Sequence, residues 1–453
     1  MSSNTMDPTA HRPMDVSETA PGTKLPVIAE TKNDPPAEAL EPRRGEELED
    51  LLTINDIRTL AQKKVPKMYR DYFNDGADDM ITLHDNEAAY NRYKIRPRVL
   101  IDMSNLDSTT NMFGTKISLP LGFAPAAAHK LAHPDGEAAT SRAAAKAGIP
   151  MGLSSYSNTP IEEVACEGRG NPYIMHLTIM KDRSKTLQTL RRVESESDQA
   201  LVTQGFIPSD SVYEMLTSNG WSEAGFKGVI LTVDAAVLGQ RLNEYRNNFK
   251  MPPGVGFPIL QFEDSTGAGK EAPVNKGAKG FKSVITAEKD NGQSWESVMP
   301  WIKSQTKLQV WVKGIYHPED VKMAIKYGLD GVVISNHGGR QLDGVPASLD
   351  ALRDCAPAAC DENGKRLIQI AVDGGIRRGS DIFKAIALGA QMVFVGRIPI
   401  WGLSVGGEEG VTKAVQILTQ EFRQTMALAG CRTVADITPD RLAILSKGRL
   451  LKL

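Results

Sequence analysis

Short apolar runs alternate with amphipathic stretches from residue 115 to the end of the chain. Eight runs have the length and composition of buried strands, and they cover residues 119–124, 149–153, 173–177, 228–233, 309–313, 331–335, 367–372 and 392–395. Helical patterns lie between them, as at residues 136–147, 318–327 and 380–388, and a last helix is expected at 412–428. This alternation predicts an α/β fold, a (β/α)8 TIM barrel formed by residues 115–453. A doubly wound open sheet is the alternative architecture.

Two further segments precede the barrel. Residues 1–46 are rich in Pro, Glu, Thr and Ser and have little apolar periodicity, so we expect a disordered tail. Residues 47–114 are expected to form a helical segment that packs on the barrel. Its first helix runs over residues 53–64 with Asn55-Asp56 as candidate cap residues, and its second helix carries Tyr72 near the end.

One connection, at about residues 246–294, is unusually long for a compact domain. It is rich in Gly, Pro and Lys and follows the fourth predicted strand. Because this strand ends at the carboxyl face of the barrel, the sequence predicts a lid over that face.

Composition and charge exclude several classes of partner. The chain has 41% hydrophobic residues and a net charge of -2, which gives no indication of a nucleic-acid partner. No apolar run is long enough to predict a membrane span. The pair Cys355 and Cys360 lacks a second pair at zinc-site spacing, so we expect reduced thiols, no metal site and a cytoplasmic location. The ending Leu451-Lys452-Leu453 resembles the peroxisomal Ser-Lys-Leu signal weakly, which leaves the peroxisome as an alternative.

The chemistry of such a barrel is expected at the carboxyl ends of its strands. The sixth strand is followed by the run Ser335-Asn-His-Gly-Gly-Arg-Gln-Leu-Asp-Gly344. Here His337 places a base suited to neutral pH close to Arg340, which can grip a carboxylate through two hydrogen bonds. The alternative interpretation is a surface turn that happens to contain a histidine.

Two more strand ends carry charged residues. Asp234 ends the fourth strand and is a candidate to orient His337 and to stabilise its protonated form. Lys313 ends the fifth strand, where a cation can stabilise negative charge on a cofactor. A structural loop cap for Asp234 and a solvated lysine for Lys313 are the alternatives.

The seventh and eighth strands suggest a phosphate site. Asp373-Gly374-Gly375-Ile376-Arg377 follows the seventh strand, and Gly396-Arg397 follows the eighth. Phosphate groups in these barrels are often held by these two loops, and glycine amides with two arginines suit a phosphate monoester.

Together these residues resemble the FMN-dependent 2-hydroxy acid dehydrogenase and oxidase family over residues 50–445. The run His337-Gly-Gly-Arg-Gln-Leu-Asp343 is highly specific for that family, and the runs 132–137, 231–234 and 373–378 support it. The resemblance implies oxidation of a small L-2-hydroxy acid to the 2-oxo acid, with electrons passing to flavin N5 and then to O2 or another acceptor. Whether they leave the substrate as a carbanion or as a hydride is left open.

The resemblance also implies roles for individual residues. His337 matches the catalytic base and Asp234 its carboxylate partner, while Arg340, Arg241 and Tyr72 match the groups that bind the substrate carboxylate. Lys313 matches the lysine near the flavin N1/O2 edge. The other residues at flavin-contact positions are Ala126, Ala127, Ser154, His176, Thr232, Asp373, Gly375, Arg377, Gly396 and Arg397.

Three positions depart from the glycolate oxidase pattern. His176 and Thr178 stand where those members have Gln and Tyr, and Tyr156 stands in place of a pocket-lining Trp. Thr178 is too short to reach a substrate hydroxyl as that Tyr does. We therefore expect a roomier substrate pocket at Tyr156 and Thr178 and a substrate other than glycolate.

Two other functions remain as alternatives. One is a catalytically silent FMN-binding barrel with a structural or regulatory role, and the other is a different phosphate-binding barrel enzyme. A haem is not expected, because the 46-residue tail is too short for a haem domain and lacks suitable His spacing. The resemblance further implies a homo-oligomer, with a tetramer as one form.

Overall fold

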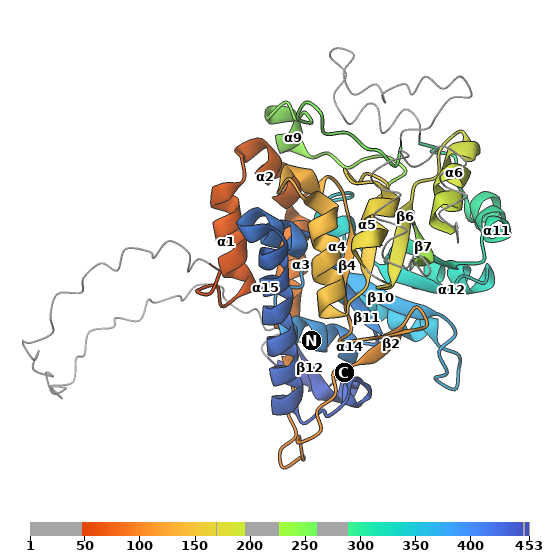
Figure 1. Cartoon of the computed structure of the whole chain (residues 1–453). Helices are drawn as coiled ribbons and strands as arrows, with labels where there is room; N and C mark the ends of the chain where they lie inside the picture. Colours follow the sequence, from red (N-terminus) through yellow and green to blue (C-terminus); the bar gives the residue numbers. More distant parts are fainter. Residues whose placement is uncertain (1–47, 169, 195–225, 261–288, 447–448, 453) are drawn as a thin grey trace, which may run out of the picture. The chain divides into compact units, whose positions relative to one another are not determined.

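The protein is a closed eight-stranded parallel barrel surrounded by helices (Figure 1). The computed structural model describes residues 48–168, 170–194, 226–260, 289–446 and 449–452, which belong to one compact unit, Glu47–Leu453. The barrel strands are β4 (Leu121–Ala126), β5 (Met151–Leu153), β6 (Tyr173–Leu177), β7 (Phe226–Thr232), β8 (Gln309–Ile315), β9 (Gly331–Ile334), β10 (Gln369–Asp373) and β11 (Met392–Val395). They pair in chain order and β11 closes the ring on β4. The TIM barrel is confirmed, and the open sheet is wrong.

The helices of the barrel follow the strands along the chain. They are α4 (Gly136–Ala147), α5 (Ile161–Glu167), α6 (Arg183–Glu194), α11 (Trp295–Gln305), α12 (Pro318–Lys326), α13 (Ser348–Cys355), α14 (Gly379–Ala387) and α15 (Arg397–Ala429). The last helix was expected at residues 412–428 but begins at Arg397. Its backbone leaves helical geometry at Gly406 and Gly407, and this break hides the first part of the helix from a periodicity argument.

Apolar sequence sets the strand positions. Parallel strands of a barrel are covered on both faces, so most of their residues are apolar, and every residue of β6 is buried. The first strand starts at Leu121 rather than at residue 119. Pro120 has no N–H to donate, and its carbonyl accepts the bond from Val393 N (3.0 Å) just before the strand begins.

A hairpin closes the amino-terminal end of the barrel. Strands β2 (Thr110–Met112) and β3 (Thr115–Ile117) form it, and Met112 and Phe113 share one buried cluster with the inward-facing side chains of the strands. The ring of Phe113 lies 5.0 Å from that of Trp311 on β8. Since side chains fill this end, a ligand has access from the carboxyl end.

Three helices precede the barrel: α1 (Ile54–Lys64), α2 (Lys67–Asn74) and α3 (Ile81–Arg92). The expected cap of α1 is corrected. Thr53 is the N-cap residue, and Asp56 returns the bond to the Thr53 backbone as the third residue of a capping box. Helix α1 then packs against α15 (Figure 1).

The remaining elements are short. The strands β1 (Tyr93–Ile95), β12 (Leu442–Ser446) and β13 (Arg449–Lys452) form an antiparallel sheet. The other short elements are α9 (Leu242–Arg246) and the 3-10 helices η1 (His129–Leu131), η2 (His337–Gly339), η3 (Ala356–Ala359), η4 (Val434–Asp436) and η5 (Pro439–Arg441).

Two expectations fall partly or wholly outside the described residues. The disordered tail at residues 1–46 lies outside them, and so does the central part of the expected lid, residues 261–288. In the part of the chain that the structure describes, no helix has the length and hydropathy needed to cross a membrane.

Candidate functional site

A cavity of about 140 Å³ lies at the carboxyl ends of the barrel strands. Its lining comes from strands β4, β8, β10 and β11, from the loops after β9 and β10, and from helices α2 and α15. Eleven of the expected site residues line it: Tyr72, Ala126, Ala127, Lys313, His337, Arg340, Asp373, Gly375, Arg377, Gly396 and Arg397. The structure therefore brings residues that are up to 325 positions apart in the chain (Tyr72 to Arg397) to one place.

His337 and Asp234 form a hydrogen-bonded pair at this cavity. His337 Nδ1 lies 3.1 Å from Asp234 Oδ1, and the two side chains are 30% and 5% exposed. Since the carboxylate can only accept, Nδ1 carries the proton and Nε2 keeps its lone pair. His337 sits in the left-handed region with φ +57°, an unusual conformation for a residue other than glycine that occurs often at active sites.

The surroundings keep the histidine neutral and the aspartate ionised. Burial lowers the pKa of His337, Asp234 opposes that effect, and the nearby Lys313 ammonium adds to the lowering. Burial alone would raise the pKa of Asp234, but the His337 side chain, through its hydrogen bond and its charge when protonated, acts together with the Lys313 and Lys289 ammonium groups to lower it overall. A neutral imidazole beside a carboxylate is prepared to accept a proton.

Lys313 is a buried cation next to this pair. Its Nζ lies 3.1 Å from Asp373 Oδ2 and donates to Ser335 Oγ (2.9 Å), while Ser335 Oγ also accepts from the backbone N–H of His337 (3.1 Å). Burial would lower the pKa of Lys313, but Asp373 and Asp234 raise it overall. A permanent ammonium group at the cavity wall is the result.

Two arginines and a tyrosine lie together beside the cavity. The guanidinium of Arg340 donates to the backbone carbonyls of Tyr72 and Asp75 and lies 5.2 Å from the centre of the Tyr72 ring. Arg241 precedes α9, and its side chain is 11% exposed. Burial and the neighbouring Arg241 lower the pKa of Arg340 to about 10, so its guanidinium group is charged at neutral pH.

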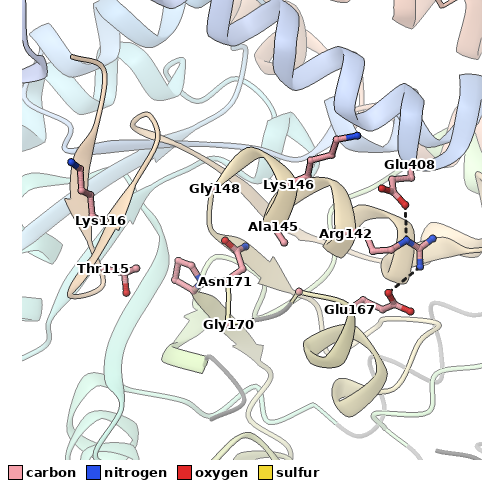
Figure 2. Close-up of a pocket in the computed structure, with 12 residues that line it drawn as sticks. Thr115, Lys116, Arg142, Ala145, Lys146, Gly148, Glu167, Gly170, Asn171 and Glu408 are labelled. Atoms are coloured by element: carbon pink, nitrogen blue, oxygen red, sulfur yellow. Dashed lines mark hydrogen bonds and ion pairs between the residues drawn. The ribbon is translucent and has the colours of Figure 1, made fainter. Parts of the chain in front are cut away.

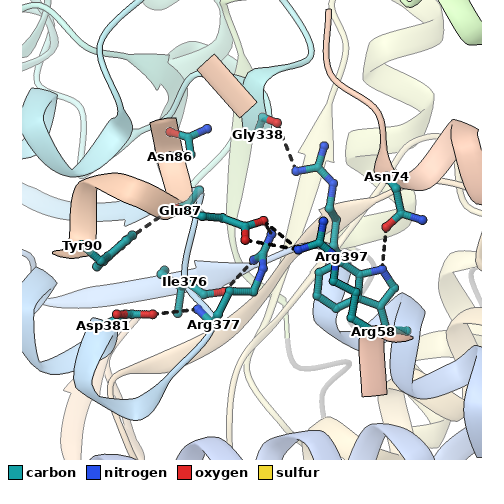
Figure 3. A network of polar contacts seen from close by, with 12 residues as sticks. Arg58, Asn74, Asn86, Glu87, Tyr90, Gly338, Ile376, Arg377, Asp381 and Arg397 are labelled. Atoms are coloured by element: carbon teal, nitrogen blue, oxygen red, sulfur yellow. Dashed lines mark hydrogen bonds and ion pairs between the residues drawn. The ribbon is translucent and has the colours of Figure 1, made fainter. Parts of the chain in front are cut away.

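The arginines of the expected phosphate site have protein partners of their own. Arg397 donates to the carbonyls of Phe73 (2.9 Å), Gly338 (3.1 Å) and Asp75 (3.2 Å). Arg377 Nη2 lies 2.8 Å from Glu87, which also binds Arg58 in the network that Figure 3 shows. Burial and the surrounding arginines lower the pKa of Arg397 to about 9.

Several donor and acceptor atoms at the cavity match a phosphorylated, hydroxyl-rich cofactor. Asp373 Oδ1 and Arg377 Nε are buried and have no hydrogen-bond partner among the described residues. A carboxylate suits ribityl hydroxyls, and a guanidinium suits phosphate. A Cβ at Gly396 would meet only the Cβ of Ala124, at 3.8 Å, so the backbone there is open to close approach.

Gly375 has a packing reason to be glycine. Its φ is +77°, and an added Cβ would lie 1.9 Å from the carbonyl oxygen of Asn86 on α3. The loop after β10 therefore rests directly on α3, and this contact alone explains the residue type at the expected cofactor position.

The other expected site residues do not line the cavity. His176 on β6 accepts a hydrogen bond at Nδ1 from Ser155 N (3.3 Å), and burial with Lys313 lowers its pKa to about 3, so it is neutral. The ring of Tyr156 lies 6.5 Å from that of His176. Three more expected site residues are Ser154, Thr232 and Thr178. Ser154 Oγ accepts a hydrogen bond from Tyr156 N (3.1 Å), and Thr232 ends β7. The carbonyl of Thr178 accepts a hydrogen bond from Thr186 Oγ1 (3.2 Å).

Two charged residues at the site were not found from the sequence. Glu244 on α9 contacts Arg241, and the short spacing between the two was the available signal. Lys289 pairs with Met180 through an isolated antiparallel bridge and donates to the carbonyl of Ala235. Burial lowers the pKa of Lys289 to about 8, an effect that Asp234 opposes, and no local pattern indicates this long-range contact.

A larger cavity of about 570 Å³ opens at the amino ends of β5 and β6 (Figure 2). It contains none of the expected site residues. Arg142, its central cation, is bound by Glu408 (2.6 Å) and Glu167 (3.3 Å). The smaller cavity is therefore the candidate active site, because chemistry and not size distinguishes the two.

The fold and the site together define a class of protein. A (β/α)8 barrel with a His–Asp pair, a buried lysine and two arginines at the carboxyl face is typical of barrel enzymes that hold a phosphorylated cofactor beside a general base. The family model described as FMN-dependent dehydrogenase matches residues 61–208 and 197–444. The chain belongs to this family, which confirms the resemblance seen in the sequence and FMN as the cofactor.

Known proteins are similar over most of the chain. The oxidase FUB9 of Gibberella moniliformis is 45% identical over 404 residues, which cover 89% of this chain and 94% of that protein. The glycolate oxidase of Spinacia oleracea is 39% identical and covers 87% and 96%. The solved structure of mandelate oxidase with (S)-4-hydroxymandelic acid has a TM-score of 0.73 at 31% identity and covers 89% and 100%. The chain is thus an enzyme of the 2-hydroxy acid oxidase family.

Proposed function

We propose that this protein uses FMN to oxidise a small L-2-hydroxy acid to the 2-oxo acid. The observation that carries the proposal is the hydrogen-bonded His337–Asp234 pair at a cavity with two arginines beside it. A base and a carboxylate-binding group on one side of a cavity are what removal of a proton from a 2-hydroxy acid requires.

The residues at the site have separate roles in the proposed reaction. Arg241, Arg340 and Tyr72 bind the substrate carboxylate and thereby orient carbon 2 and its hydroxyl group. His337 Nε2 accepts a proton from the substrate, and Asp234 stabilises the imidazolium that forms. When bound beside these residues, FMN would supply the two-electron acceptor, and O2 or another acceptor would reoxidise it.

Both positively and negatively charged side chains hold the cofactor in this proposal. Lys313 neutralises negative charge at the flavin, and Asp373, Gly375, Arg377, Gly396 and Arg397 bind the ribityl and phosphate groups. The residues Ala126, Ala127, Ser154, His176 and Thr232 border the ring. At about 140 Å³ the cavity is below the roughly 300 Å³ of a small ligand pocket, so we expect side chains at its wall to move when FMN binds.

The substrate has a side chain larger than that of glycolate. Thr178 is short, and Tyr156 belongs to an aromatic cluster with Tyr72, Phe249 and Phe257 that gives the substrate side chain an apolar surface. The similar mandelate oxidase, whose structure was solved with (S)-4-hydroxymandelic acid, supports an aromatic or branched 2-hydroxy acid.

A purified sample tests the enzyme against the silent FMN-binding barrel, which the short Thr178 favours. The protein is expected to be yellow with FMN and to bleach anaerobically with at least one member of a panel of 2-hydroxy acids of varied chain length and aromaticity. Colour that persists with the whole panel supports the silent barrel. A colourless protein that does not take up FMN contradicts both.

Location and assembly are part of the same proposal. Cys355, Cys360 and Cys431 form no disulfide, which supports a reducing compartment and hence the cytoplasm. We expect a homo-oligomer, with a tetramer as the form to test by light scattering of the FMN-bound protein.

A further inference from the structure

An acidic side chain lies between the two arginines of the carboxylate site. Glu244 Oε1 is 3.2 Å from Arg241 Nη1 and 3.6 Å from Arg340 Nη2, and all three side chains are between 11% and 14% exposed. Helix α9 presents Glu244 from one side, while Arg340 arrives from the loop after β9. One carboxylate of the protein therefore already contacts both groups that are proposed to receive a carboxylate of the substrate.

The charges at this position can be counted. Two guanidinium groups and one carboxylate leave a net charge of about +1, which one substrate carboxylate balances. Other charged groups nearby include Asp71, Asp75, whose carboxyl accepts from Asn243 Nδ2 (2.7 Å), and Arg397. Burial raises the pKa of Asp75 against the effect of the arginines, and Arg397 is assigned to the cofactor phosphate.

From this arrangement we propose that Glu244 determines substrate specificity: it neutralises one of the two arginines and so limits the site to 2-hydroxy acids with a single negative charge. The inference rests on the proposed function and deepens it by naming the substrate class as monocarboxylates. A dicarboxylate would bring a second negative charge into a site with no net charge left to balance it.

Removal of the charge is expected to leave the site assembled. Arg340 is held by the carbonyls of Tyr72 and Asp75 and by the Tyr72 ring, none of which involves Glu244. Glutamine in place of Glu244 keeps an oxygen that accepts from Arg241. The substitution therefore changes the charge of the site more than its shape.

The experiment compares two substrates of equal chain length, 2-hydroxypentanoate with one carboxylate and 2-hydroxyglutarate with two. In the FMN-bound Glu244→Gln variant, the ratio of kcat/KM for the dicarboxylate to that for the monocarboxylate is expected to rise about tenfold over the parent protein. Glu244→Asp keeps the charge and is expected to keep the ratio. Glu319→Gln removes an exposed charge on α12 and serves as the matched control.

Binding without turnover separates this inference from the proposed function. The FMN-bound protein is titrated with butyrate, a monocarboxylate, and with succinate, a dicarboxylate, and binding is followed by the absorbance of the flavin. The two dissociation constants give the preference for one or two carboxylates without any turnover. If no 2-hydroxy acid reduces the flavin but the binding ratio shifts, the function fails and the role of Glu244 stands. An unchanged ratio in Glu244→Gln, and in Glu244→Ala if the first variant does not fold, overturns the inference, as does a parent protein that binds neither carboxylate.

Discussion

At the residue scale, the site depends on pairs of ionisable groups that adjust one another. His337 is kept neutral by burial and by Lys313, and Asp234 restrains that effect. Lys313 keeps its charge because Asp373 lies 3.1 Å away. The same residue types in water would have ordinary pKa values, so the reactivity comes from their enclosure at the strand ends.

Replacement of the base tests the central assignment. His337→Gln is expected to retain FMN but to reduce the rate of flavin reduction by about a thousandfold, because a positioned base is lost while the hydrogen-bonding amide remains. Anaerobic stopped-flow absorbance of the bound flavin measures this rate. A loss of less than about tenfold contradicts the role of His337 as the base.

The partner carboxylate sets the pH dependence. The pKa of His337 is below its ordinary value, so kcat/KM should fall as the pH decreases through a pKa below about 6.5. Asp234 raises that pKa, so Asp234→Asn should move this acid limb to lower pH and slow flavin reduction about a hundredfold, since the imidazolium loses its counter-charge.

A pH profile of kcat/KM measured on the parent and the variant decides this prediction. Glu319→Gln, which removes an exposed charge on α12, should leave the acid limb where it was. An acid limb that moves to higher pH in Asp234→Asn would show that the carboxylate does not act on His337 in the way proposed.

At the element scale, the sequence predicted the barrel because each strand carries its own signal. The run at β6 and the run at β11 match the structure residue for residue, and α4 does so as well. Boundaries shifted where a single residue overrides periodicity, as Pro120 does at β4 and as Gly406 and Gly407 do within α15. Periodicity reports burial, whereas a boundary depends on which backbone groups can bond.

The site was less completely predicted for a related reason. Residues at or just after the ends of strands, such as Lys313 near the end of β8 and His337 after β9, were found because the fold places all strand ends together. Lys289 was missed because its contact with Ala235 joins a loop to a strand end 54 positions away, and no local pattern reports it. Glu244 was missed although its spacing from Arg241 was visible, because only the fold brings Arg340 to its other side.

The contact between α3 and the loop after β10 gives an element-scale prediction. Gly375→Ala should destabilise the protein by about 3 kcal/mol, because its Cβ would overlap the Asn86 carbonyl at a backbone φ of +77°. Gly344→Ala is the matched control: its φ is +81°, but nothing lies within 4 Å of the added Cβ, so a loss of about 1 kcal/mol is expected. Urea unfolding of both variants measures the difference, and equal losses would contradict the packing argument.

At the scale of the whole molecule, the cofactor site joins parts of the chain that are distant in sequence. The cavity lining includes Tyr72 from α2 and Arg397 at the start of α15, and Arg397 already ties that helix to the carbonyls of Phe73 and Asp75. A ligand that binds here would contact both α2, which precedes the barrel, and α15, its last helix. Its binding energy therefore adds to the stability of the folded state as a whole.

Removal of the cofactor should lower the thermal stability of the entire unit. At FMN concentrations of about a hundred times Kd, the expected stabilisation is roughly 3 kcal/mol, which appears as a rise of Tm in scanning calorimetry.

Riboflavin has the same ring but no phosphate, so it should raise Tm less if Arg377 and Arg397 bind the phosphate. In Arg377→Met the gap between the two ligands should narrow, because one phosphate contact is gone. If FMN and riboflavin raise the Tm of the parent protein equally, the flavin ring accounts for the binding energy. That result would contradict phosphate binding by Arg377 and Arg397.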